Sequence, residues 1–345
     1  MNKDFWMNKR VLITGHNGFK GCWLTKWLDM LGAYVIGFSL PAEETSGFKQ
    51  LKLSDRFVEI TGDIRNKSDV ERIMAYRPQI VIHLAAQAIV GVAQNNPVET
   101  FETNLMGTVH LLEMLRNVED VRSIVVITSD KVYENIETMG GYRETDRLMG
   151  SEPYSCSKVC EEQAAKAYYE SYFKYRGVGV ATARASNAYG GGDYHFDRLI
   201  PYLEECAIKQ ETPVVRNPQS VRPWQYVLDL LHGYMLLAQK LFAEPERFSE
   251  GFNFGPDPEE LYTVGEMADI ICGRQVTREK QAYYEAGLLQ IDSQKSKDKL
   301  GWKPFYNVEQ GLQETGLAYG HYATNGNSSE LYENRIIEFE QKLEE

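Results

Sequence analysis

The sequence predicts an α/β fold, in which a doubly wound parallel sheet carries a smaller mixed domain toward the C-terminus. Short continuous apolar runs alternate with segments of helical spacing over the first 190 residues, a glycine-rich turn follows the first run, and the pattern loosens afterwards. Strands that are separated by helices pair in parallel through right-handed crossovers. We therefore expect one domain over residues 1–190 and a smaller region over 191–345, interleaved at their boundary.

The first half contains six candidate strands and four candidate helices. The strands are short apolar runs, at 9–15, 33–39, 57–64, 78–86, 122–130 and 177–190. The helices have apolar residues three and four positions apart, at 19–32, 68–77, 98–116 and 154–175. In the first helix this apolar stripe includes Trp23, Trp27 and Leu31, and Gly32 ends it.

The second half is less regular. Residues 190–196, "GGGDYHF", are expected to form a glycine-rich loop, and residues 216–241 a loop followed by a helix. Residues 252–256 predict a short strand and turn. The tail from Asn325 predicts a turn and then a charged amphipathic helix.

The overall charge argues against two classes of partner. The chain has 37 Lys and Arg against 49 Asp and Glu, a net charge of −12. Because an acidic surface repels phosphates and anionic lipid, neither nucleic acid nor a membrane is expected as a partner. No run approaches the roughly 20 apolar residues of a spanning helix, and the N-terminus lacks the apolar stretch of a signal peptide. With five scattered cysteines, these features predict a reduced, cytoplasmic protein without a metal site.

A glycine turn lies between the first strand and the first helix. In "TGHNGFKG", Asn17 stands where a G-x-G-x-x-G pattern has its second glycine. Such a turn brings backbone amides at a helix N-terminus close to a pyrophosphate. A tight turn without a ligand is the alternative, but the position between a buried strand and a helix favours a Rossmann dinucleotide site. Its expected contacts are Gly15, Asn17, Gly18, Phe19, Lys20 and Gly21.

The ends of later strands supply further cofactor contacts. Asp63 is expected to bind the adenine, and the small residues of "HLAA" let the backbone approach the ribose. The second strand ends at Ser39, where an acid would select NAD, and Lys20 is the nearest basic side chain. NAD is the expected cofactor, and NADP stays open. These further cofactor residues are Asp63, Ile64, Leu84, Ala85, Ala86 and Thr128, together with Tyr154 and Lys158.

A tyrosine and a lysine share one face of the helix at 154–175. Tyr154 and Lys158 are four residues apart. A nearby ammonium stabilises a phenolate and lowers the tyrosine pKa toward the working range. Taken alone, such a pair is more often a packing tyrosine beside a surface lysine. Together with the glycine turn and with Ser129 at the end of the fifth strand, it indicates a catalytic set of Ser129, Tyr154 and Lys158.

These motifs resemble those of the extended short-chain dehydrogenase/reductase group and, within it, of nucleotide-sugar 4,6-dehydratases of the CDP-glucose 4,6-dehydratase type. The Asp-Lys pair after Ser129 is typical of that type, whereas other sugar-nucleotide dehydratases carry Asp-Glu there and epimerases carry small residues. The resemblance runs through "TGHNGFKG", "HLAAQ", "TNLMGTVHLLE", "TSDKVYEN", "GYRE", "PYSCSK", "GGGDYHFDRLIP", "RNPQSVRPWQYVLD", "FNFGP" and "LGWKP".

The resemblance implies a reaction in three stages. Tyr154 takes the proton of the sugar 4-hydroxyl while hydride passes from C4 to the nicotinamide, water then leaves across C5 and C6, and hydride returns to C6. Asp130 is implied as the acid for the C6 oxygen and Lys131 as the base at C5, each with a shifted pKa. A charged Lys131 that stabilises the enolate is the alternative role. A solvent-exposed ion pair of Asp130 and Lys131 is the alternative without chemistry.

The resemblance also implies substrate contacts and an assembly. Arg222 resembles the diphosphate-binding arginine, and the other implied substrate residues are Gln87, Asn187, Arg198 and Arg216. Residues 88–97 and 136–140 depart from the type where they border the sugar site, which leaves the nucleotide and the hexose open. A homodimer or a dimer of dimers is expected, acting in deoxysugar and lipopolysaccharide biosynthesis. The alternative functions are an epimerase or oxidoreductase of the same superfamily, and a non-catalytic NAD(P)-binding sensor or scaffold.

Overall fold

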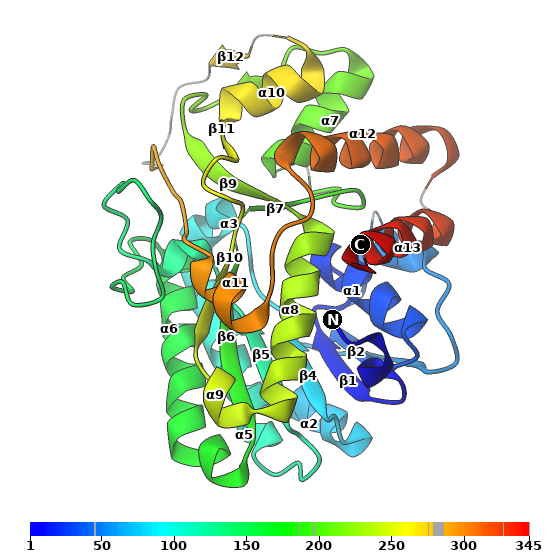
Figure 1. Ribbon diagram of the computed structural model, residues 1–345, viewed down its shortest axis with the longest axis vertical. Helices are drawn as coiled ribbons and strands as arrows, with labels where there is room; N and C mark the ends of the chain where they lie inside the picture. The colour runs from blue at the N-terminus through cyan, green and yellow to red at the C-terminus, as the bar shows by residue number, and fades with distance from the viewer. Residues whose placement is uncertain are drawn as a thin grey trace.

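Seven parallel strands form the large sheet of the computed structural model, in the order β10-β6-β5-β4-β1-β2-β3 (Figure 1). The structure describes residues 1–44, 46–185, 187–195, 197–274, 276–278, 286–326 and 328–344. The predicted doubly wound sheet is confirmed. The chain moves outward from β1 in one direction and then from β4 in the other, so the switch point of the topology lies between β1 and β4. The strands are β1 (Arg10–Thr14), β2 (Tyr34–Ser39), β3 (Phe57–Thr61), β4 (Ile80–His83), β5 (Ser123–Ile127), β6 (Gly179–Ala185) and β10 (Gly251–Phe254).

Helices cover both faces of this sheet. On one face α1 (Phe19–Met30) packs beside α8 (Val227–Ala243), which crosses β4, β5 and β6. The other face carries α2 (Lys67–Ile73), α5 (Gly107–Leu115) and α6 (Pro153–Tyr168). Alternate strand residues enter two separate apolar cores, one for each face. The strands are therefore buried on both sides, which explains their continuous apolar runs.

Two predicted elements are corrected by the structure. The helix expected over 98–116 consists of α4 (Pro97–Phe101), a π-helical turn η4 (Glu102–Met106) and α5. The π turn buries Asn104, whose side chain bonds two other segments. The strand expected over 177–190 contributes to two sheets, because β6 ends at Ala185 and β7 (Asn187–Tyr189) pairs with β9 (Val221–Tyr226).

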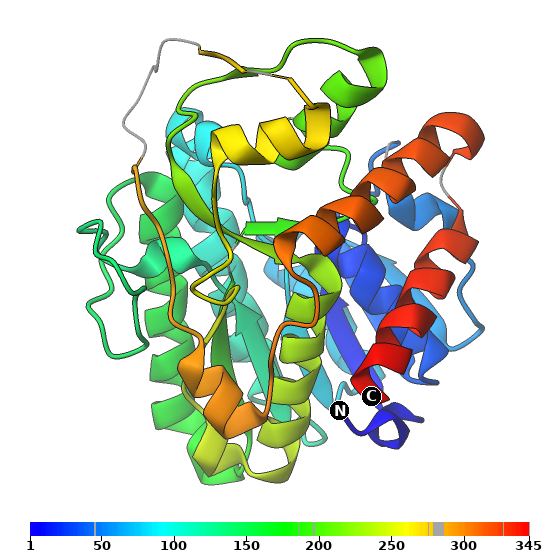
Figure 2. The same ribbon diagram turned by 45° about the horizontal axis from the view of Figure 1, so that its top comes forward.

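The smaller region lies at the top of Figures 1 and 2. Its three-stranded sheet has the order β11-β9-β7, and a second small sheet pairs β12 with β8. Helix α8 and strand β10 follow residue 191 in the sequence but join the large sheet, and the boundary at residue 190 stays a prediction. Helices α9 (Pro245–Phe248) and α11 (Gln294–Leu300) likewise pack against α8 and the large sheet. The remaining elements of the smaller region are α7 (Leu199–Lys209), β8 (Val214–Val215), β11 (Leu261–Thr263), α10 (Val264–Cys272), β12 (Thr277–Arg278) and α12 (Val308–Asn325).

The C-terminal helix α13 (Ser329–Glu344) folds back onto α1, and the two chain ends lie close together (Figure 1). Trp27 Nε1 donates a hydrogen bond to Glu340 over 2.7 Å. Lys3 pairs with Glu344 over the same distance. Among the described helices, none combines the length and apolar character needed to cross a bilayer.

Candidate active site

The glycine turn after β1 fits a bound dinucleotide. Gly15 has a φ of +73°, and a Cβ atom there would lie 2.8 Å from the Ala85 amide nitrogen. A Cβ atom on Gly21 would collide with the Gly15 carbonyl oxygen, so α1 approaches the turn as closely as glycine permits. Gly18, the N-cap of α1, is exposed. The N-terminus of α1 is therefore accessible to an anionic group.

The turn after β4 lies beside the glycine turn. Leu84 N donates to the Thr14 carbonyl over 3.0 Å, and Ala85 N donates to Thr14 Oγ1 over 3.2 Å. Ala86 follows, and all three residues of this turn are half-buried. The predicted cofactor residues from two distant parts of the sequence thus meet at the switch point of the sheet.

Two of the predicted cofactor contacts have their polar groups engaged within the protein. Asn17 Nδ2 donates to the Leu40 carbonyl over 2.7 Å, which holds the segment after β2. Asp63 accepts hydrogen bonds of 2.9 and 2.6 Å from the Arg65 guanidinium. This contact lowers the pKa of Asp63, so a ligand at Asp63 would meet a carboxylate that is already paired.

The other early residues of the predicted site lie on opposite faces of the sheet, with Phe19 and Lys20 on α1 and Ile64 in the core of the other face. Phe19 packs against the core, and Ile64 is buried. Burial and the charges of Lys158 and Arg198 lower the pKa of Lys20 to about 7. Lys20 therefore lies within electrostatic reach of Lys158 on helix α6.

A polar cluster lies at the tip of β5, where η5 (Asp130–Val132) begins. Ser129 Oγ donates to Asp130 Oδ1 over 3.0 Å and accepts from Lys131 N over 3.2 Å. Asp130 is 2% exposed, and its Oδ2 has no hydrogen-bond partner among the described residues. Burial raises the pKa of Asp130 against the opposing charge of Lys131. A solvent-exposed Asp130–Lys131 pair, the alternative without chemistry, is wrong.

Helix α6 brings a phenol and an ammonium to the same cluster. Glu152 caps the helix by accepting from Tyr154 N and Ser155 N, each over 2.7 Å, which fixes the first turn. Tyr154 is buried, and Lys131 Nζ lies 5.9 Å from the centre of its ring. Burial raises the pKa of Tyr154, while the Lys158 charge and the Ser129 hydroxyl oppose this rise.

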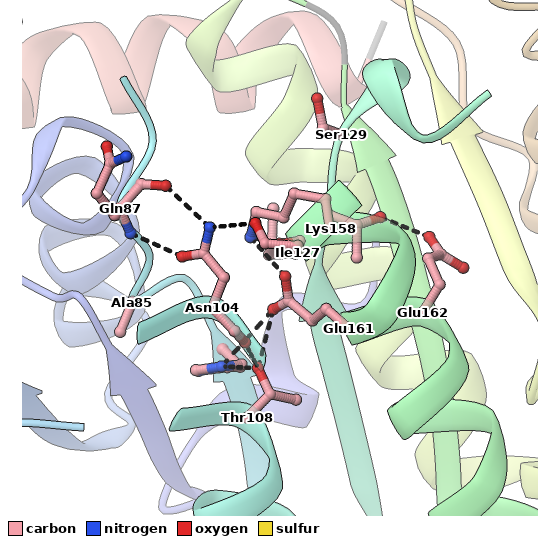
Figure 3. A network of polar contacts seen from close by, with 12 residues as sticks. Ala85, Gln87, Asn104, Thr108, Ile127, Ser129, Lys158, Glu161 and Glu162 are labelled. Carbon is pink, nitrogen blue, oxygen red and sulfur yellow. Dashed lines mark hydrogen bonds and ion pairs between the residues drawn. The ribbon is translucent and has the colours of Figure 1, made fainter. Parts of the chain in front are cut away.

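A buried polar network supports Lys158 from below (Figure 3). Lys158 Nζ donates to the Ile127 carbonyl over 3.1 Å and to Glu161 Oε2 over 2.6 Å. Asn104 Nδ2 donates to the Gln87 carbonyl over 3.0 Å and to Ser157 Oγ over 2.8 Å. The sequence-based prediction omitted Asn104 and Glu161, although Asn104 lies in a resembling motif and Glu161 follows Lys158 by three residues.

The predicted cofactor residue Thr128 faces a second buried network. Its hydroxyl donates to Glu162 over 2.6 Å, and Glu162 also accepts two hydrogen bonds from Arg184 and one from Thr182. The hydroxyl of Thr128 is therefore engaged within the protein, and contact between Thr128 and a cofactor stays a prediction. The buried charge of Arg184 accounts for this orientation, because its counter-charge Glu162 needs hydrogen-bond donors.

The predicted substrate residues divide into two sets. Arg222 is 7% exposed and its charge acts on Asp130, while the charge of Arg198 acts on Lys20. Arg222 donates to the carbonyls of Val221 and Ala286, and Arg198 pairs with Asp193 over 2.9 Å. Arg222 thus lies near Asp130 of the β5 cluster, and Arg198 lies near Lys20 on α1.

The second set contains Gln87, Asn187 and Arg216. The Gln87 side chain bonds Thr100 and the backbone of Ile89, so it braces its own segment. Asn187 is half-buried on β7, in register with Trp224 of β9. Arg216 is half-buried directly after β8. For these three residues, substrate contact stays a prediction.

Known proteins resemble the chain over almost its whole length. A family model described as GDP-mannose 4,6 dehydratase matches residues 12–315. A CDP-glucose 4,6-dehydratase from Salmonella typhimurium is 42% identical over 332 residues, which cover 91% of this chain and 90% of that protein. The predicted resemblance to sugar-nucleotide 4,6-dehydratases is thereby confirmed.

Solved structures share the fold. An epimerase from Methanothermobacter thermautotrophicus has a TM-score of 0.82 at 24% identity, with 96% of each chain covered, and indicates the fold alone. A dTDP-glucose 4,6-dehydratase double mutant from Streptomyces venezuelae, solved with NAD bound, has a TM-score of 0.79 at 25% identity, with 93% of this chain and 99% of that chain covered. With a family model that spans most of its length and a relative at 42% identity, the chain belongs to the GDP-mannose 4,6 dehydratase family.

Proposed function

We propose that the protein is a CDP-glucose 4,6-dehydratase, which converts CDP-D-glucose to the 4-keto-6-deoxy sugar nucleotide and water. The observation that carries the proposal is the cluster of a phenol, a carboxyl and two amines that β5 and α6 form beside the glycine turn. The choice of CDP-glucose is supported by the relative at 42% identity, which bears that activity in its name.

The proposed cofactor is NAD, held at the glycine turn and at the turn after β4. When bound, it would accept hydride from C4 of the sugar and return it to C6. The close approach of the Gly15 backbone to Ala85 and the exposed N-cap Gly18 of α1 support this assignment. Strand β2 ends at Ser39, which is 7% exposed and carries no charge to exclude a 2′-phosphate, so NADP is the alternative to test.

The side chains of the cluster divide the proton transfers. Tyr154 takes the proton of the 4-hydroxyl, Lys158 stabilises the phenolate, and Ser129 orients the hydroxyl. Asp130, whose pKa is raised by burial, keeps a proton for the departing C6 oxygen. Lys131 either removes the C5 proton or stabilises the enolate that forms when it leaves.

A panel of sugar nucleotides tests the proposal. Purified protein with NAD is incubated with CDP-, dTDP-, GDP- and UDP-hexoses, and the masses of the products are measured by mass spectrometry. We expect CDP-glucose to lose one water and Lys131→Ala to slow that loss strongly. An epimerase would change no mass and would keep most of its activity in Lys131→Ala. A sensor or scaffold would bind NAD and convert none of the hexoses.

The proposed assembly is a homodimer in the cytoplasm, acting in deoxysugar and lipopolysaccharide biosynthesis. Large apolar side chains lie exposed along the helices that cover one face: Val98 is 69% exposed, Met106 42% and Tyr172 40%. A second copy of the chain would bury them. Light scattering after gel filtration is expected to give twice the chain mass, and Met106→Glu to reduce the dimer fraction. A wild-type monomer at micromolar concentration would contradict the proposal.

A further inference from the structure

Glu161 is a buried carboxylate bound directly to the lysine of the Tyr154–Lys158 pair. It follows Lys158 by three residues on α6 and therefore shares its face of the helix. Its Oε2 lies 2.6 Å from Lys158 Nζ, and the two side chains are 1% and 3% exposed. Figure 3 shows the pair directly below the tip of β5.

The other oxygen of Glu161 ends a chain of buried hydrogen bonds. Thr108 Oγ1 lies 3.1 Å from Glu161 Oε1 and 2.8 Å from His83 Nε2. It also lies 2.7 Å from the Asn104 carbonyl oxygen, so Glu161 and Asn104 compete for its one hydroxyl proton. His83 Nδ1 lies 2.6 Å from Thr14 Oγ1, which accepts from Ala85 N over 3.2 Å. Burial lowers the pKa of His83 to about 3, so the ring is neutral.

A neutral ring lets every donor in this chain point the same way. In the Nε2–H tautomer, the Ala85 amide donates to Thr14, Thr14 donates to His83 Nδ1, and His83 Nε2–H donates to Thr108. The Thr108 hydroxyl then donates to Glu161 or to the Asn104 carbonyl. The chain starts at the turn where the cofactor would lie and ends at the counter-charge of Lys158. Thr14, His83 and Thr108 are each 0% exposed, so water cannot replace these contacts without opening the core.

The lysine is held from two sides. Glu161 and the carbonyl of Ile127, the last residue of β5, accept two of the three N–H bonds of the ammonium. The third is left for the cofactor and Tyr154. A buried ion pair adds little net stability, whereas loss of one partner leaves a buried charge uncompensated. The pair therefore contributes little to the stability of the fold, and its main effect is to hold Lys158 Nζ in place.

We propose that Glu161 is the positioning residue of Lys158, which fixes the ammonium at the tip of β5 and connects it through Thr108, His83 and Thr14 to the cofactor turn. The neighbouring Glu162 does not share this task. It binds Arg184, Thr128 and Thr182 instead, and Figure 3 shows the two carboxylates pointing in different directions. The positioning of Lys158 is argued from the contacts alone, and only the role of Tyr154 as the base rests on the proposed function.

The pH dependence of turnover separates positioning from a simple charge effect. Lys158 opposes the raised pKa of Tyr154 more strongly than Glu161 adds to it. If Glu161 holds Lys158 in place, Glu161→Gln weakens the support for the phenolate and moves the acidic limb of kcat/KM to higher pH. If Glu161 is only a nearby negative charge, its removal moves that limb to lower pH. The charged or titratable groups that face Tyr154 are Lys158, Asp130, Glu161, Lys131 and Tyr234.

The test compares three variants with the wild type. Glu161→Gln keeps the shape and removes the charge, and Thr108→Val removes the hydroxyl that holds Oε1. Glu170→Gln is the matched control, because its pair with Lys174 is exposed on the continuation of the same helix. Thermal melting and circular dichroism report folding, calorimetry gives the Kd for NAD, and kcat/KM is measured against pH.

We expect Glu161→Gln to weaken NAD binding and to reduce kcat/KM, each at least tenfold, with the acidic limb displaced to higher pH. Thr108→Val should move both quantities in the same direction by a smaller factor, and Glu170→Gln should change neither. A limb that moves to lower pH, or an unchanged Kd for NAD in folded Glu161→Gln, overturns the proposal. If Glu161→Gln does not fold, unchanged Kd and pH limb in Thr108→Val overturn it. Because calorimetry needs no sugar nucleotide, NAD binding still tests Glu161 if the proposed function fails.

Discussion

Replacing Asp130 with asparagine should separate sugar oxidation from water loss. Asparagine has the same shape and still accepts the 3.0 Å hydrogen bond from Ser129. Its amide cannot deliver a proton to a departing C6 oxygen. The side chain is 2% exposed, so bulk water has little access to replace it as the acid. Oxidation, which uses Tyr154, should continue.

The expected loss follows from the size of general acid catalysis. A positioned acid contributes about 10²–10⁴ in rate, which is about 2.7–5.4 kcal/mol at 1.36 kcal/mol for each factor of ten. Because burial raises the pKa of Asp130, the active protonated form persists to higher pH than in an exposed aspartate. Water loss by the wild type should therefore fall as the pH rises through that pKa, and the residual rate of Asp130→Asn should not show this decline.

Asp130→Asn should lower the rate of water loss but should not lower the stability of the fold. A carboxyl whose pKa is raised by folding contributes stability below its unfolded pKa and loses that contribution as the pH rises through its folded pKa. Asp130→Asn should therefore be at least as stable as the wild type at neutral and alkaline pH. Urea unfolding monitored by fluorescence measures this difference.

The assay follows nicotinamide absorbance and product mass together. With CDP-glucose, Asp130→Asn should accumulate reduced cofactor and an oxidised hexose that has not lost water. The wild type should instead return the hydride to the sugar. Asp120→Asn is the control, because Asp120 pairs with Arg77 on the surface. Water loss by Asp130→Asn within tenfold of the wild-type rate would refute the assignment of Asp130 as the acid.

Three further changes have defined outcomes. Glu162→Gln leaves the 5%-exposed Arg184 without its counter-charge, and urea unfolding should show a loss of about 3–5 kcal/mol; a loss below 1 kcal/mol would contradict this reasoning. Gly15→Ala places Cβ against Ala85 N at a φ of +73° and should weaken NAD binding at least tenfold by calorimetry. Gly320→Ala should bind NAD normally, because no atom of the described residues lies within 4 Å of its Cβ. Lys131→Ala should slow water loss about 10²–10⁴-fold without abolishing C4 oxidation, and equal losses in both steps would argue against its place at C5.

The sequence predicts the sheet and the catalytic helix well because both depend on local patterns. Continuous apolar runs identify buried strands, and the spacing of Tyr154 and Lys158 places them on one face of α6 whatever the rest of the chain does. The short run at 252–256 was identified as a strand, but its pairing with β6 depends on a contact between residues far apart in the sequence. Its place in the large sheet therefore could not be predicted.

The residues that support the site could not be predicted either, because their contacts also join residues that are far apart in the sequence. Glu161 has no local signal that separates it from any acidic residue on a helix. Its role depends on Thr108 of α5 and His83 of β4, which only the packed structure brings together. For Thr128, the local signal is present, because a position at a strand end indicates a cofactor contact. In the structure its hydroxyl instead donates a hydrogen bond to Glu162.

The most direct test of the account uses CDP-glucose that carries deuterium at C4. If the cluster at β5 and α6 performs oxidation, elimination and hydride return within one active site, the product should have lost one water and should carry the deuterium at C6. A product without deuterium at C6, or a product that retains its full mass while the sugar changes configuration, would contradict the account.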